Sequence, residues 1–250
     1  MAKAYNERCI VLKHTKLGET DVIVTMLGGD GRQIRAVAKG LRKPGNRIGA
    51  RLELFAEADL LLHEGKSLDI VREVKTIATN ASIREELERT AAASVETEFL
   101  EKLGREGVVL GERMYEMSAA SMRTIAELPA RRAAFIAAAF LFKAMAMQGF
   151  APATRECALC GTSIEQVKAF DVSYGGALCD DCLGRLGICT TIDSRAAAWI
   201  EALLFSTFAQ IADIESYPEI ELLDLAHMWV CEHAGFELKS IAFLKTLLMG

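Results

Sequence analysis

Several features of well-known enzyme classes are missing from this sequence. Its 250 residues contain no Walker-type phosphate loop, no G-x-G-x-x-G after a strand pattern, no G-x-S-x-G elbow and no H-x-E feature of a zinc deaminase. The four histidines are His14, His63, His227 and His233. They are scattered, and none is paired with a carboxylate in a recognisable acid/base or metal-ligand spacing. Nothing in the sequence therefore argues for an enzyme.

Long apolar runs are also missing. The longest candidate for a membrane span, residues 133–147, is interrupted by Lys143 and falls short of the roughly 18 apolar residues that a span requires. The amino-terminal residues lack the apolar core of a signal peptide. We therefore expect a cytoplasmic protein with no membrane partner. In a reducing compartment, seven cysteines are better explained as metal ligands and buried thiols than as a disulfide framework.

Acidic residues are missing from one segment, residues 32–52, although the whole chain carries a net charge of −5. Residues 1–80 contain 14 Lys and Arg against 10 Asp and Glu, a net charge of +4, whereas residues 81–250 contain 15 against 24, a net charge of −9. The acid-free segment contains seven basic residues: Arg32, Arg35, Lys39, Arg42, Lys43, Arg47 and Arg51. The acidic average therefore hides a basic amino-terminal region.

These seven positive charges predict a site for an anionic polymer. Without a counter-ion they repel one another, and a polyanion would relieve this repulsion while releasing its own condensed counterions. A solvated basic loop without a ligand is the alternative. Tyr5 and Phe55 are the only aromatic residues among the first 80. Backbone electrostatics should therefore outweigh base stacking, which favours binding with little sequence preference.

The apolar pattern of residues 7–77 is typical of β-strands. We expect strands at residues 9–13, 21–27, 33–38, 53–63 and 69–75, with a glycine-rich hairpin turn at residues 28–31. Five short strands predict a small closed or nearly closed barrel, because so short a sheet gains most by removing its edges. The OB-fold is the commonest barrel of this size that handles nucleic acid.

Four cysteines form two C-x2-C pairs separated by 18 residues: Cys157, Cys160, Cys179 and Cys182. Two such pairs, brought together by a hairpin, complete a tetrahedral zinc site. We predict one structural Zn²⁺ ion per chain, since four sulfur ligands leave no open position for catalysis. Two structural disulfides or four core thiols are the alternatives. Three further cysteines are expected to be small buried core residues: Cys9, Cys189 and Cys231.

Beyond residue 80 the pattern is helical. Ser82 with Glu85 predicts a capping box at the start of a helix that ends near Gly104. Further helices are expected at residues 111–128, 131–149, 194–211, 218–234 and 239–249. We predict an α+β multidomain chain, with an OB-fold domain at residues 1–80 and an α-helical domain at residues 81–250. The helical domain carries the four-cysteine zinc-finger insert at about residues 154–188.

Three segments carry a resemblance to a known family. The first contains I-V-L at residues 10–12, G-E-T-D at 18–21 and I-V-T-M-L at 23–27. The second, A-V-A-K-G-L-R-K-P at residues 36–44, is a strand that opens into a basic loop. The third, G-F-A-P at residues 149–152, leads into the first cysteine pair. Together they resemble the RecO family of bacterial recombination mediators, which act in the RecF pathway of DNA repair.

The resemblance covers nearly the whole chain and implies a non-catalytic function. It implies binding to single- and double-stranded DNA and annealing of complementary strands coated with single-stranded-DNA-binding protein. It also implies cooperation with RecR in loading RecA, an indirect link to RecF, and a location on the nucleoid. The seven basic residues are then the expected DNA-binding residues. Family contacts with the tail of single-stranded-DNA-binding protein lie in the helical domain, where no motif matches and no residue is assigned.

Two other classes stay open at this point. A zinc-ribbon transcriptional regulator, or another nucleic-acid-binding protein, would share the cysteine spacing but would need a recognition helix with base-contacting Arg and Asn. A metal-dependent nucleic-acid enzyme would need paired carboxylates or an open metal position.

Overall fold

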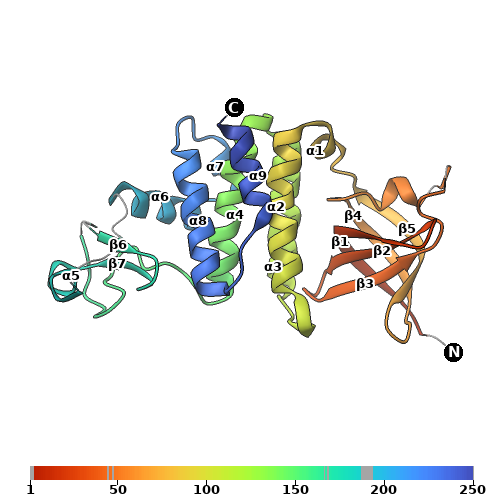
Figure 1. The fold of residues 1–250 in the computed structure, drawn as a ribbon, viewed down its shortest axis with the longest axis horizontal. Helices are drawn as coiled ribbons and strands as arrows, with labels where there is room; N and C mark the ends of the chain where they lie inside the picture. The colour runs from red at the N-terminus through yellow and green to blue at the C-terminus, as the bar shows by residue number, and fades with distance from the viewer. Residues whose placement is uncertain are drawn as a thin grey trace. The chain divides into compact units, whose positions relative to one another are not determined.

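The structure is a computed structural model that describes residues 3–43, 45–46, 48–165, 167, 169–186 and 194–249. Contacts divide the chain into two units, Met1–Ala133 and Ala134–Gly250 (Figure 1). This division is a different property from the domain boundary expected at residue 80, which stays a prediction. None of the helices in the described part of the chain combines the length and the apolar content needed to cross a bilayer.

The first unit begins with a closed barrel of five strands in the order β1-β2-β3-β5-β4. Its strands are β1 (Ala4–Leu17), β2 (Asp21–Gly28), β3 (Gln33–Ala38), β4 (Glu57–His63) and β5 (Asp69–Ala78). Neighbouring strands are antiparallel except for the parallel pair β3 and β5. Closure pairs each of these five strands on both sides, so the prediction of a small OB-like barrel is confirmed.

The barrel interior follows from the alternation of apolar residues. In β4, Ala58, Leu60 and Leu62 are buried, whereas the residues between them are partly exposed. The predicted start of this strand at residue 53 is wrong, since β4 begins at Glu57. A 3-10 helix, η1 (Gly49–Arg51), and a turn at Phe55 precede the strand, and the Phe55 φ of +70° is incompatible with an extended chain.

Helices follow the barrel in the first unit: α1 (Ala81–Glu85), α2 (Leu87–Leu103), α3 (Glu112–Glu127) and the 3-10 helices η2 (Arg105–Gly107) and η3 (Ala130–Arg132). The predicted capping box at Ser82 is wrong. The Ser82 hydroxyl instead donates to the Ala126 carbonyl at 2.8 Å, a contact with α3. Glu86 is extended (φ −121°, ψ 132°) and separates α1 from α2.

Two glycines join the barrel to α3 within the first unit. A Cβ atom on Gly31, in the turn between β2 and β3, would lie 2.0 Å from the backbone nitrogen of Gly111. The neighbouring Leu110 N–H donates to the Gly31 carbonyl at 2.9 Å. Only glycine at position 31 permits this approach of two backbones, so the turn is fixed against the start of α3.

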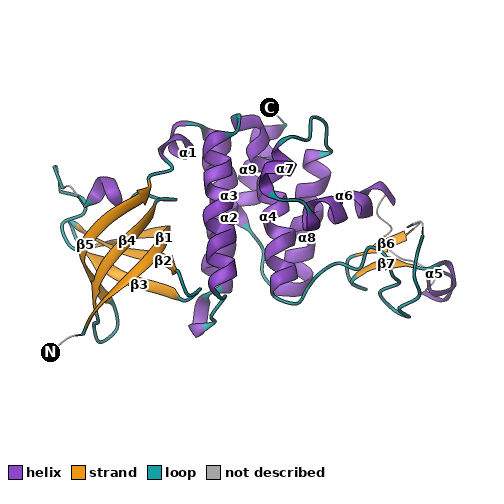
Figure 2. Cartoon of the chain, turned by 180° about the vertical axis from the view of Figure 1, so that it is seen from behind, coloured by secondary structure: helices purple, strands orange, loops and turns teal. Residues whose placement is uncertain are grey.

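The second unit contains α4 (Ala133–Met147), α6 (Ser194–Phe205), α7 (Phe208–Ala212), α8 (Glu219–Ala234) and α9 (Lys239–Leu248). The second unit also contains the strands β6 (Ala169–Asp171) and β7 (Gly176–Leu178), which Figure 2 shows next to the short helix α5 (Asp180–Leu186). The single helix predicted at residues 194–211 is two helices. Thr207 and Gln210 form a capping box that starts α7.

Candidate functional site

Four cysteine side chains of the second unit meet at one point. The Sγ atoms of Cys157, Cys160, Cys179 and Cys182 all lie within 4.8 Å of one another. The Sγ atoms of Cys160 and Cys179 are 3.7 Å apart. This distance is close to the ~3.8 Å edge of a tetrahedron whose sulfurs lie about 2.3 Å from a central zinc ion. The cluster therefore fits a four-coordinate metal site built from both cysteine pairs.

Short local elements bring the two pairs together. The antiparallel hairpin of β6 and β7 ends directly before Cys179. The second pair then lies at the start of α5, where the Leu183 N–H donates to the Cys179 carbonyl at 2.9 Å. The first pair lies in a turn closed by the Gly161 N–H, which donates to the Cys157 carbonyl at 2.9 Å. Gly161 has a φ of +71°, which glycine adopts without a Cβ penalty.

Hydrogen bonds at the cluster favour thiolates at two positions. Burial acts to raise the pKa of Cys157, but hydrogen bonds from backbone N–H groups, that of Cys179 first, outweigh burial and lower this pKa to about 6. A hydrogen bond with the Thr162 side chain lowers the pKa of Cys160. Hydrogen bonds with Cys179 and Cys160 raise the pKa of Cys182 to about 12. A divalent cation would supply the positive charge that lets all four sulfurs ionise together.

The disulfide alternative does not match these distances. Disulfide sulfurs lie about 2.05 Å apart, and every described cysteine is a free thiol. Four incidental core thiols are also disfavoured, because Cys160 is exposed. Among the other cysteines, Cys9 is buried as expected, Cys231 is only partly buried, and Cys189 lies outside the described residues.

The seven basic residues predicted to bind DNA do not all lie in one place. Arg32 precedes β3 and Lys39 follows it, so roughly 23 Å of extended chain separates them. Arg32 Nη2 lies 3.4 Å from Glu7 Oε2, and Arg32 Nε bonds to the Asp30 carboxylate. Two acids therefore compensate the charge of Arg32. Arg35 is exposed on the outside of β3.

Lys39, Arg42 and Lys43 lie together on the segment that follows β3, and all three are exposed. We call residues 39–51 the basic loop. Arg47, inside this loop, lies outside the described residues, so its placement stays a prediction. The three described side chains present three uncompensated positive charges, since no ion pair to any of them occurs among the described residues.

The far end of the basic loop is anchored to the barrel. Arg51 Nη1 donates to the Val74 carbonyl of β5 at 3.0 Å. Leu52, the next residue, is completely buried in the barrel core. The His14 ring Nε2 donates to the Leu52 carbonyl at 2.7 Å. Arg51 therefore helps to fix the base of the loop as well as contributing charge.

Lys16 lies at the same end of the barrel, although it is not part of the acid-free segment. In the strand register Lys16 pairs with Val22 of β2, and Val22 pairs with Ala38 of β3, the residue before Lys39. Two strand spacings of about 4.8 Å place its backbone roughly 10 Å from Ala38. Lys16 is exposed. Only the strand pairing reveals this proximity, because the two lysines are far apart in the sequence.

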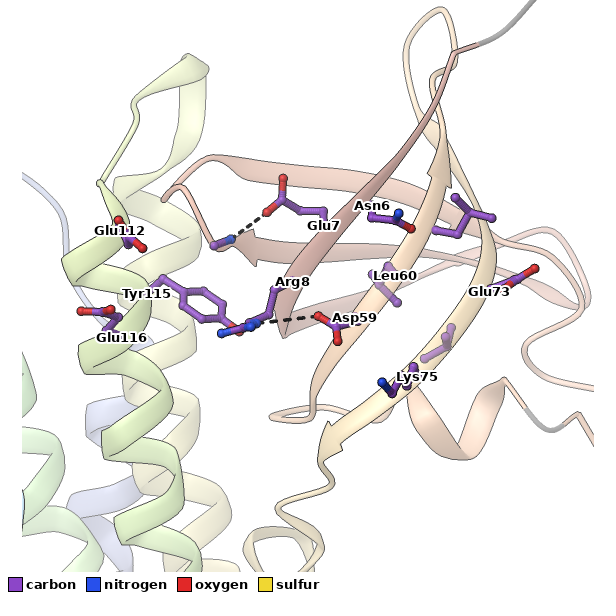
Figure 3. A pocket seen from close by; sticks show the side chains of 13 residues that line it. Asn6, Glu7, Arg8, Asp59, Leu60, Glu73, Lys75, Glu112, Tyr115 and Glu116 are labelled. Atoms are coloured by element: carbon purple, nitrogen blue, oxygen red, sulfur yellow. Dashed lines mark hydrogen bonds and ion pairs between the residues drawn. The ribbon is translucent and has the colours of Figure 1, made fainter.

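A cavity of about 700 Å³ lies on the other side of the barrel, between β1, β4 and β5 and the start of α3 (Figure 3). Arg8 faces Asp59 across its floor at 3.7 Å. Acidic side chains predominate in the lining: Glu7, Asp59, Glu73, Glu112 and Glu116, against Arg8 and Lys75. Phosphates would be repelled here, so this cavity is disfavoured as a DNA site.

Two sequence-family models match the chain. The model described as Recombination protein O N terminal matches residues 1–80. The model described as Recombination protein O C terminal matches residues 84–242. The chain belongs to the RecO family. RecO proteins are generally non-enzymatic mediators of recombination and repair, and the resemblance found in the sequence is thereby confirmed.

Neither open alternative gains support in the described residues of this RecO protein. The helix that carries Cys182, α5, begins with Asp180 and Asp181, whose negative charges would repel DNA phosphates. Within the described residues, the four cysteines are the one group of three or more His, Cys, Asp or Glu whose ligand atoms come close enough to share an ion. This group contains four sulfur ligands and no carboxylate.

Proposed function

We propose that this protein is a non-catalytic recombination mediator that binds single- and double-stranded DNA through its basic loop. The observation that carries the proposal is the group Lys39, Arg42 and Lys43, exposed and uncompensated on an OB-like barrel in a RecO chain. Phosphates would replace the missing counter-ions, and the scarcity of aromatic residues would keep sequence preference low. Lys16 and Arg35 would extend the basic surface along the barrel.

Charge neutralisation would also explain strand annealing. Two complementary strands repel each other through their phosphates, and a basic surface that holds one strand lowers this repulsion for the second. We propose that the protein anneals strands coated with single-stranded-DNA-binding protein and, with RecR, helps to load RecA, with RecF as an indirect partner. Membership of the RecO family supports these partners.

We further propose that the four-cysteine cluster holds one structural Zn²⁺ ion. Cys157, Cys160, Cys179 and Cys182 would be its ligands, and their thiol chemistry and tetrahedral spacing support zinc over the harder cations. The ion would provide charge neutralisation for four thiolates. The residues themselves hold β6, β7 and α5 in one small cluster with a few apolar side chains. Elemental analysis of protein purified without chelator should find close to one zinc per chain, and a zinc-free, fully folded protein would contradict this assignment.

The DNA proposal is tested by removing three charges from the basic loop. In a variant with Arg42→Ala, Lys43→Ala and Arg47→Ala, we expect weaker binding to single-stranded DNA. Each lost phosphate contact should lower the slope of log affinity against log salt by roughly 0.7 to 0.9, or about 2 to 3 in total. Fluorescence anisotropy at several salt concentrations measures both quantities.

A matched control removes the same charge from other exposed positions. Arg105→Ala, Arg113→Ala and Arg185→Ala together also remove three positive charges, but none of these residues belongs to the barrel. We expect this control to keep nearly the wild-type affinity and salt slope. Equal losses in the two variants would mean that net charge alone decides binding, and an unchanged loop variant would disprove the proposed DNA site.

A further inference from the structure

An acidic residue is bonded to the beginning of the basic loop. Asp21 begins β2, and its Oδ1 accepts a hydrogen bond of 2.7 Å from the backbone N–H of Gly40. The Thr20 hydroxyl donates to the same oxygen at 3.2 Å. Gly40 follows Lys39 directly and has a φ of +63°, which leads the chain out of β3 into the basic loop. The Asp21 carboxylate therefore holds the first turn of the loop.

The other side of the Gly40 residue is held as well. Its carbonyl accepts from Asn46 Nδ2 at 2.6 Å and from the Lys43 N–H at 3.0 Å. Asn46 Oδ1 in turn accepts from the Ile48 N–H at 2.8 Å. Gly40 is thus bonded through both its N–H and its carbonyl, and both Lys43 and Asn46 bond back to this residue.

The turn that carries Asp21 makes two more bonds to the basic loop. The Arg42 N–H donates to the Thr20 carbonyl at 3.0 Å, and Arg42 Nη1 donates to the Glu19 carbonyl at 3.1 Å. The β1–β2 turn is therefore bonded to the loop at two residues, Gly40 and Arg42. Two of these bonds involve a charged group, the carboxylate of Asp21 and the guanidinium of Arg42, and the bond to Asp21 is the shorter, at 2.7 Å against 3.1 Å.

Electrostatics alone gives no reason for an acid at this position. A carboxylate bonded to the backbone of the basic loop repels the phosphates that the loop attracts, and it lowers the positive potential there. The positive charges of the loop also repel one another. This repulsion favours loop conformations in which the basic side chains are too far apart to bind the same DNA strand. A fixed acceptor that holds the loop in one shape offsets this tendency, so geometry accounts for the acid where charge does not.

We propose that Asp21 is a positioning residue for DNA binding: its carboxylate holds the Gly40 peptide so that Lys39, Arg42 and Lys43 are presented together to the phosphates of one strand. Asn46 completes the arrangement from the other side of Gly40. This inference rests on the proposed DNA-binding function of the basic loop and adds a residue of opposite charge to that site.

The test separates geometry from charge with two substitutions at one position. Asp21→Ala removes both the negative charge and the hydrogen-bond acceptor, whereas Asp21→Asn removes the charge and keeps an acceptor. We expect Asp21→Ala to bind single-stranded DNA roughly tenfold more weakly than the wild type, since a bond to a charged acceptor is lost. We expect Asp21→Asn to bind as tightly as the wild type or a few-fold more tightly.

Glu19→Ala is the matched control for charge. Glu19 lies in the same turn and is exposed, but only its backbone carbonyl contacts the loop among the described residues. Loss of this side chain should therefore leave affinity equal or slightly higher. Asn46→Ala removes a loop bond without changing charge and should weaken binding as Asp21→Ala does. This second variant, checked by circular dichroism, decides the matter if Asp21→Ala fails to fold.

The outcomes are distinguishable. Equal affinities for Asp21→Ala, Asp21→Asn and Glu19→Ala, or a wild-type affinity for Asn46→Ala, would overturn the positioning role. If those results came with weakened binding by the Arg42, Lys43 and Arg47 variant, only this inference would fail. If that loop variant itself bound like the wild type, the proposed DNA site would fail first, and the role of Asp21 would fall with it.

Discussion

Removing the proposed Zn²⁺ ion from the four-cysteine cluster should be visible at Trp229, a residue far from the cysteines in sequence. Phe170 lies in β6, the hairpin that leads to Cys179, and its ring centroid is 6.0 Å from that of Trp229 in α8. His233 of α8 also donates from Nε2 to the Val172 carbonyl, just after β6, at 2.9 Å. The hairpin thus packs on α8 through residues that the cluster holds in place.

The size of the effect follows from burial. Phe170 and Trp229 are both essentially inaccessible to solvent. At the cluster itself, Ala169 and Leu178 are the buried apolar residues that pack with the cysteines, and we expect chelation to release the hairpin. Exposure of the Phe170 side chain alone costs about 2 kcal/mol. For a unit of this length, residues 134–250, that loss lowers Tm by about 8 °C.

Tryptophan fluorescence measures the release directly. The chain has two tryptophans, so a Trp199→Phe variant reports on Trp229 alone. Chelation should shift its emission to longer wavelength, and added Zn²⁺ should reverse the shift. Cys179→Ser should show the shifted emission without chelator. An unchanged spectrum and Tm after complete metal removal would refute the reasoning, because the hairpin would then stand without the ion.

Two further predictions concern stability. Gly31→Ala should lower the Tm of the first unit by more than Gly107→Ala, because both glycines have φ above +80° but only the Gly31 Cβ would meet a backbone atom, Gly111 N, at 2.0 Å; equal melting temperatures would contradict the close approach. Burial raises the pKa of Glu219 to about 7, and its Oε1 has no hydrogen-bond partner in the described chain. Because the pKa of Glu219 is higher in the folded than in the unfolded protein, the stability that its protonated carboxyl group contributes is fully present below the pKa of the unfolded state. It is lost as pH rises through the folded-state pKa of about 7, so Tm should fall between pH 5 and pH 8. Glu219→Gln should remove that part of the fall, and an identical pH profile for the variant would show that Glu219 is not its source.

The barrel was predictable because its strands carry a clear period of two. In β4, for example, Ala58, Leu60 and Leu62 alternate with partly exposed neighbours. Five such short strands predict a closed barrel, because closure removes the edges of the sheet. The start of β4 was not predictable. The positive φ of Phe55 depends on tertiary contacts, among them the bond from Asn80 Nδ2 to the Phe55 carbonyl at 2.8 Å. No local pattern encodes a contact with a residue so distant in the chain.

Helix ends were the least predictable part of the fold. Ser82 and Glu85 match a capping box, yet the Ser82 hydroxyl bonds to Ala126 of α3. A side chain that suits a cap locally found a tertiary acceptor instead. The opposite case is Thr207 with Gln210, a true capping box hidden inside a run of residues that the sequence assigned to one long helix. Helix α5 was missed because seven residues are too few to show a period of 3.6.

The two candidate sites differ in how much the sequence reveals. The spacing of the four cysteines predicts that their sulfur atoms come together, and in the structure these atoms lie within 4.8 Å of one another. The basic loop was visible as a charge run, but its organisation was not. The sequence could not separate Arg32, which is compensated by Glu7 and Asp30, from Lys39 at the other end of β3. Nor could it bring Lys16 close to Ala38, because that proximity exists only through strand pairing.

The central claim is that the basic loop carries the DNA chemistry of this recombination mediator. Its most direct test is the rate at which the protein anneals complementary strands coated with single-stranded-DNA-binding protein. We predict that the wild type accelerates annealing and that the Arg42→Ala, Lys43→Ala and Arg47→Ala variant, folded and with its zinc content unchanged, loses most of this acceleration. Full annealing activity in that variant would contradict the account.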